Sequence, residues 1–88
     1  MLILRGELDV ETAPVLNRAL RDAEEDRPRR LVLELSALSF VDSTGLGLLV
    51  LAANRAADAQ RQLVLRNLSD QVERLLTITG LTSEFTVE

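Results

Sequence analysis

Hydrophobic and polar residues follow two kinds of pattern along this chain. Short, almost continuous apolar runs at 2–4, 31–35, 63–65 and 85–87 have the length of strands, and the last is typical of an edge strand. Between these runs lie longer segments whose apolar residues recur every three or four positions, as in amphipathic helices. Strands that alternate with helices in this way predict an α/β domain with one layered core.

The first helical pattern is expected to begin at Thr12, a residue type favoured at helix N-caps. Pro14 falls in the first turn, where its missing N–H is tolerated, and Pro28 ends the segment after a run of charged residues. Ahead of this helix, residues 6–9 are predicted to form a turn in which Gly6 is free to adopt a positive φ.

A second helix is predicted from Ser43 to about Gln60, and a shorter third one precedes Gly80. Residues 36–41 are expected to connect the strand at 31–35 to this second helix, and residues 67–69 to form a turn and cap before the third. Gly80 is a residue type favoured just after a helix C-terminus. The apolar positions of the two helices are Leu46, Leu49, Val50 and Ala53, and Val72, Leu75, Leu76 and Ile78.

These elements predict a small single domain over residues 1–88, with no linker or internal repeat. We expect a mixed, mostly parallel β-sheet of about four strands with helices packed against it. A chain of 88 residues is near the low end of independently stable sizes, but 47% hydrophobic residues suffice for a core. Only Phe40 and Phe85 are aromatic, so this core must be aliphatic.

Composition excludes most catalytic chemistry. The chain has no Cys and no His, and all ten basic residues are Arg. Neither a Ser-His-Asp nor a Ser-Lys arrangement can therefore be assembled, and the Gly-rich loop with Lys that cradles nucleotide phosphates is missing. The usual ligands of zinc are absent as well. We expect no enzymatic activity, no cofactor and no metal site.

The charge pattern argues against several partners. A net charge of −4, without a basic stripe or an aromatic platform, is a poor match for nucleic acid. The first residues are too short for a signal peptide, and no apolar run reaches the length needed to cross a bilayer. We therefore expect a soluble cytoplasmic protein without membrane insertion.

The most distinctive polar cluster is Asp42-Ser43-Thr44, which is followed by Gly45 and Gly47. Free N–H groups and the positive end of the helix dipole converge at such a helix start, so a hydroxyl here is suited to carrying a phosphate. Taken alone, the cluster is more often a simple cap. The two glycines have two interpretations: they keep the helix start bare for a partner, or they allow close packing on the sheet.

Residues 40–47 (Phe-Val-Asp-Ser-Thr-Gly-Leu-Gly) resemble the signature loop of STAS domains, specifically of bacterial anti-sigma factor antagonists. Two further blocks match this family at the expected spacing: residues 6–9 (Gly-Glu-Leu-Asp) with Thr12, and the segment from Arg74 to Leu81. Family members usually carry one more strand before the first block. We therefore expect either a minimal domain or part of a longer protein, with an exposed sheet edge and a monomeric or weakly dimeric state.

The resemblance implies a partner switch. The unmodified domain would bind an anti-sigma factor that is also a serine kinase, and so free the sigma factor. The kinase would use its own ATP to phosphorylate the Ser after the motif Asp, which is Ser43 here, with Thr44 as the less favoured acceptor. A metal-dependent serine phosphatase would reverse the step.

The residues expected at the partner surface are Asp9, Thr12, Asp42, Ser43, Thr44, Gly45, Leu46 and Gly47. Asp9 is equally well interpreted as a turn residue, Thr12 as a cap and Leu46 as a core residue. The alternative function is a constitutive STAS interaction domain of a stressosome-like scaffold, a lipid-transport complex or a larger transporter or regulator. Ser43 favours the switch, because such versions often depart from the motif at this position.

Overall fold

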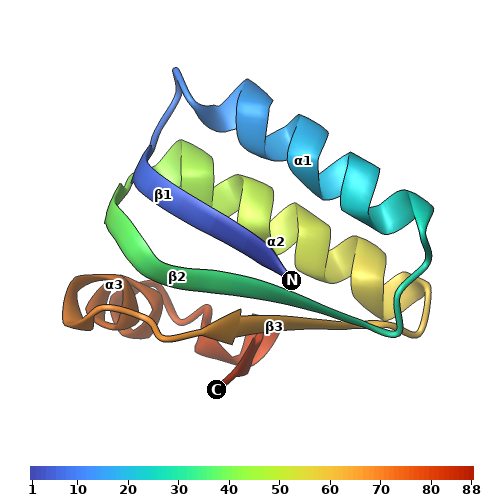
Figure 1. Ribbon diagram of the computed structural model, residues 1–88. Coiled ribbons are helices and arrows are strands. Elements are labelled where there is room, and N and C mark those ends of the chain that lie inside the picture. The colour runs from blue at the N-terminus through green and yellow to red at the C-terminus, as the bar shows by residue number, and fades with distance from the viewer.

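Strands and helices alternate along the whole chain in the computed structural model, which describes residues 1–88 (Figure 1). The elements are β1 (Leu2–Leu8), α1 (Ala13–Glu25), β2 (Arg30–Val41), α2 (Ser43–Asp58), β3 (Gln62–Arg66), α3 (Asp70–Thr79), the 3₁₀ helix η1 (Thr82–Glu84) and β4 (Thr86–Val87). The predicted α/β class is confirmed. The sheet is entirely parallel rather than mixed, because every chain reversal is made by a crossover connection and none by a hairpin.

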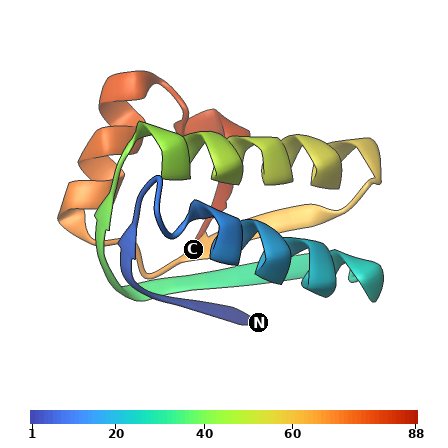
Figure 2. The ribbon, with the colours of Figure 1, turned by 90° about the horizontal axis from the view of Figure 1, so that it is seen from above.

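The four strands lie in the order β1-β2-β3-β4, so that β1 and β4 form the two edges. α1 and α2 run side by side across one face of the sheet, whereas α3 lies apart from them beside the end of β2 (Figures 1 and 2). Between the sheet and the helices lies a core of sixteen buried residues, in which Phe85 is the sole aromatic side chain. The aliphatic core is thus as predicted. No helix has the length and apolar character that crossing a membrane requires.

Two strands, β1 and β2, extend well beyond the apolar runs that predicted them. β1 continues through Gly6, which has φ +74°, to Leu8, so the turn starts at Asp9 rather than Gly6. β2 runs unbroken to Val41, and the connection predicted at 36–41 is therefore wrong. The physical reason is that β2 keeps pairing with β1 along its length, with register shifts that accommodate the extra residues of β2. This pairing brings the ends of both strands to the start of α2.

A bidentate ion pair joins the two neighbouring helices. The Nε and NH2 groups of Arg55 in α2 donate to the carboxylate oxygens of Glu24 in α1, at 2.7 and 3.0 Å. These hydrogen bonds raise the pKa of Arg55 above its usual value. The paired planar groups hold α1 and α2 in register at the end of the helices away from Ser43.

Candidate functional site

Asp42 is the residue that separates β2 from α2, and it caps the helix as predicted. Its backbone is extended, with φ −99° and ψ −177°, and its Oδ1 accepts a hydrogen bond from the backbone N–H of Gly45 at 2.9 Å. Its carbonyl oxygen accepts the first helical bond, from Leu46 N at 2.9 Å. The carboxylate is thus directed at the helix start and satisfies one of its free donors.

Ser43 and Thr44 are the first two residues of α2, and both are exposed. Neither hydroxyl belongs to any side-chain hydrogen bond of the structure, since Asp42 alone provides the cap. A free hydroxyl on the first helical residue is accessible to a partner and lies at the positive end of the helix dipole. In this cluster Asp42 therefore caps the helix, and the hydroxyl groups of Ser43 and Thr44 are free.

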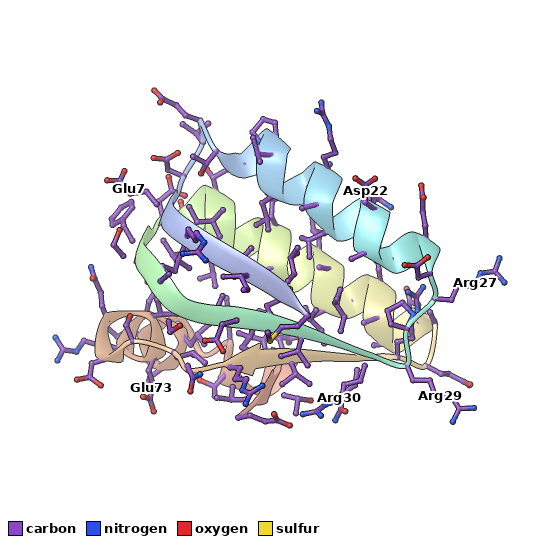
Figure 3. All side chains as sticks on the ribbon, viewed as in Figure 1. Glu7, Asp22, Arg27, Arg29, Arg30 and Glu73 are labelled. Carbon is purple, nitrogen blue, oxygen red and sulfur yellow. The ribbon has the colours of Figure 1, made fainter.

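The loop after β1 lies directly beside this helix start. The backbone N–H of Asp42 donates to the carbonyl oxygen of Leu8 at 3.0 Å, which ties the end of β2 to the end of β1. Glu7 lies at this same end of the molecule (Figure 3). The segment containing Asp9 and Thr12 follows Leu8 immediately. The fold therefore brings residues 6–12 next to the loop at residues 40–47.

Asp9 and Thr12 hold the loop closed by reciprocal hydrogen bonds. Oδ1 of Asp9 accepts from the backbone N–H of Thr12 at 3.0 Å, and Oγ1 of Thr12 accepts from the backbone N–H of Asp9 at 2.9 Å. The Thr12 hydroxyl also donates to the Glu7 carbonyl oxygen at 2.9 Å. Thr12 occupies the N-cap position of α1, but its side chain does not cap that helix. Asp9 is thus the turn residue that the sequence indicated. Thr12 lies at the expected cap position, but the expected side-chain cap is not formed, because its hydroxyl is bonded within the loop next to Ser43.

The two glycines near the helix start have different environments. A Cβ on Gly45 would lie 2.5 Å from Cγ and 2.9 Å from the carbonyl oxygen of Leu8, closer than real contacts allow. A Cβ on Gly47 would meet nothing within 4 Å. The packing interpretation therefore holds for Gly45, and Gly47 leaves a bare patch of helix. Gly45 and Leu46 are both buried, so they support the site from beneath rather than face a partner.

An exposed patch remains around Ser43, and its loop side is acidic. Val10 is 67% exposed at the tip of the loop, next to the exposed carboxylate of Glu11. No cluster of three or more His, Cys, Asp or Glu side chains is arranged to hold a metal ion. The arrangement offers an accessible hydroxyl, a fixed carboxylate and a shaped loop, which suit recognition by another protein rather than catalysis.

Replacing Asp42 by Ala is expected to lower the free energy of unfolding by about 1 kcal/mol, because the Gly45 N–H loses its acceptor. Asp42→Asn keeps a side-chain oxygen in this position and should stay close to the wild type. Urea unfolding of the three proteins measures the difference. If Asp42→Ala and Asp42→Asn were equally stable, the cap would contribute nothing.

Comparison with known proteins identifies the family of this chain. The family model described as "STAS domain" matches residues 1–88. An anti-sigma-B factor antagonist of Staphylococcus aureus is 40% identical over 76 residues, which are 86% of this chain and 70% of that protein. One of Listeria monocytogenes is 40% identical over 80 residues, which are 91% of this chain and 70% of that protein.

A solved structure agrees with the sequence comparison. The crystal structure of an anti-sigma factor antagonist from Mycobacterium paratuberculosis superposes with a TM-score of 0.85 at 29% identity, covering 97% of this chain and 72% of that one. Family model, sequence relatives and fold thus agree over nearly the whole chain. The chain belongs to the STAS domain family and, within it, to the anti-sigma factor antagonists.

Proposed function

We propose that this protein is a phosphorylation-controlled antagonist in which Ser43 carries the switch. The unphosphorylated form binds an anti-sigma factor that is also a serine kinase, and this binding releases the sigma factor. Phosphorylation of Ser43 by the kinase ends the binding, and a serine phosphatase restores it. The observation that carries the proposal is the exposed, unbonded hydroxyl of Ser43 at the start of a capped helix, in a chain of the antagonist family.

The transfer step uses groups from both proteins. Oγ of Ser43 attacks the γ-phosphorus of ATP held by the kinase, the bond from that phosphorus to the β-phosphate oxygen breaks, and ADP leaves. We assign the base that takes the hydroxyl proton to the kinase, because this chain has no His, Lys or Cys and its adjacent carboxylate, that of Asp42, is engaged as the helix cap. The neighbouring Asp42 carboxylate already accepts the Gly45 N–H and serves to hold the helix start.

The fold should tolerate the phosphate well. A phosphoserine adds roughly −1.5 to −2 charge, and a helix N-terminus stabilises an adjacent anion by about 0.3–1 kcal/mol. Because Ser43 is exposed, the phosphate stays in water and no packed group has to move. The modification therefore acts on the binding surface and leaves the folded state intact.

Intact-mass analysis before and after incubation with ATP and the cognate anti-sigma kinase tests the acceptor. We expect wild type and Thr44→Ala to gain one phosphate and Ser43→Ala to gain none. Peptide mapping should locate the phosphate on Ser43. A phosphate on Thr44, or none in a chain that still binds the kinase, would contradict the proposed switch; the second outcome would indicate a constitutive interaction domain.

A further inference from the structure

An apolar groove of about 300 Å³ lies between the end of β2 and α3. Its lining residues are Phe40, Val41, Gln71, Val72, Arg74, Leu75 and Ile78. Two of its large apolar side chains are open to solvent: Ile78 is 74% exposed and Phe40 is 41% exposed. Isolated exposed apolar residues are ordinary, but two that line one hollow beside a functional residue indicate a binding surface.

Two residues that line the groove are close to Ser43 in the chain. Val41 in its wall is two residues from Ser43, and Phe40 is three residues away, which places their Cα atoms within about 11 Å of the Ser43 Cα. Figure 1 shows the end of β2 curving between α3 and the start of α2, so the strand end that lines the groove also leads to Ser43. A partner that covers Ser43 can therefore also contact residues that line the groove.

The size of a protein interface requires contacts beyond the Ser43 loop. A stable complex buries roughly 800 Å² of each partner. This is about a seventh of the 5503 Å² surface of the molecule. Apart from Val10, the loop around Asp9 and Ser43 is polar and acidic, whereas binding energy concentrates in apolar side chains that fill pockets. The groove offers apolar side chains of this kind close to Ser43 in the chain.

The rim of the groove sets the charge of the occupant. Arg74 is the one charged side chain in the lining, it is exposed, and it takes part in none of the three ion pairs of the structure. Its guanidinium is therefore available to a carboxylate from outside. In a chain of net charge −4, the positive charge of this rim contrasts with the acidic loop that carries Asp9 and Glu11.

We infer that the groove is the docking site for an apolar side chain of the anti-sigma factor, flanked there by a carboxylate that pairs with Arg74. This inference rests on the proposed function, because it assumes that the partner covers Ser43. Docking in the groove supplies affinity, and the Ser43 side supplies control by phosphate. One interface thus contains an anchor and a switch formed by different residues.

The dissociation constant of the complex with the purified cognate anti-sigma factor tests the groove. Ile78→Ser should weaken binding at least tenfold. Arg74→Gln should weaken it severalfold, with an effect that shrinks as salt concentration rises. Val87→Ser is the matched control: Val87 is also an exposed aliphatic residue, at 45%, but it pairs with Leu65 in β3 and does not line the groove. Thermal unfolding checks that all variants are folded.

The outcomes separate the groove from the switch. If Ile78→Ser binds as tightly as Val87→Ser, the groove is not the docking site, whatever phosphorylation does. If the wild type keeps its affinity after phosphorylation, the switch at Ser43 is overturned. The comparison of Ile78→Ser with Val87→Ser still decides the groove in that case.

Discussion

Replacing Ser43 by Asp is expected to weaken binding to the anti-sigma factor at least tenfold, while the melting temperature stays within a few degrees of the wild type. Tenfold corresponds to about 1.4 kcal/mol, and a partner surface that accommodates a neutral hydroxyl must desolvate a carboxylate beside that of Asp42. The folded chain gives the added charge an exposed position at the start of α2. Isothermal titration and thermal unfolding of the same samples measure the two quantities.

Ser43→Asn is the matched control for this substitution, because Asn has nearly the shape of Asp without its charge. We expect Ser43→Asn to bind far more tightly than Ser43→Asp, and genuine phosphoserine to bind more weakly than either, since it carries about twice the charge of a carboxylate. Equal affinity of the Asp and Asn variants would show that charge at this position does not control binding. A large drop in melting temperature for Ser43→Asp would mean that the modification acts on the fold.

The sequence predicted those features of the fold that depend on local patterns. Four apolar runs gave four strands, and three periodic segments gave three helices. The cap at Asp42 and the end of α3 at Gly80 were also predicted from the sequence, because each depends on the conformation and side chain of one residue type. The aliphatic core followed from the scarcity of aromatic residues.

Features that depend on pairing between distant segments were not predicted. Residues 36–41 have no continuous apolar run, and only pairing with β1 makes them part of β2. Ile78 is one of the apolar positions of the third helix, yet it is 74% exposed. It follows Val72 by six residues rather than seven, so it lies about 120° around the helix from that buried side chain, where it lines the groove. An apolar residue that falls outside the i, i+3, i+4, i+7 spacing is therefore not expected in the core, and Ile78 lies at the surface beside the groove.

The sequence left open which of the two glycines near Ser43 is needed for packing, and the structure assigns this role to Gly45. Its absent side chain lets α2 approach the end of β1 so closely that a Cβ would lie 2.9 Å from the carbonyl oxygen of Leu8. This approach coincides with the hydrogen bond from Asp42 N to the same carbonyl oxygen. Gly45 thus couples the end of β1 and its loop to the residue that precedes Ser43.

Gly45→Ala is accordingly expected to destabilise the fold by about 1–3 kcal/mol, because the methyl group overpacks against backbone that has no room to move. In a domain of 88 residues this lowers the melting temperature by roughly 5–20 °C. The sign of this change in stability is informative, since Gly→Ala within a helix otherwise stabilises by up to about 1 kcal/mol. Urea and thermal unfolding provide the measurement.

Gly47→Ala is the internal control, two residues further along the same helix. Its Cβ would enter open space, so we expect the stability to rise by up to about 1 kcal/mol. Opposite signs for two identical substitutions would separate close packing from helix propensity without reference to any partner. If both variants were stabilised, the end of β1 would have to yield to α2, and the position of the Ser43 loop would then be set by something other than this contact.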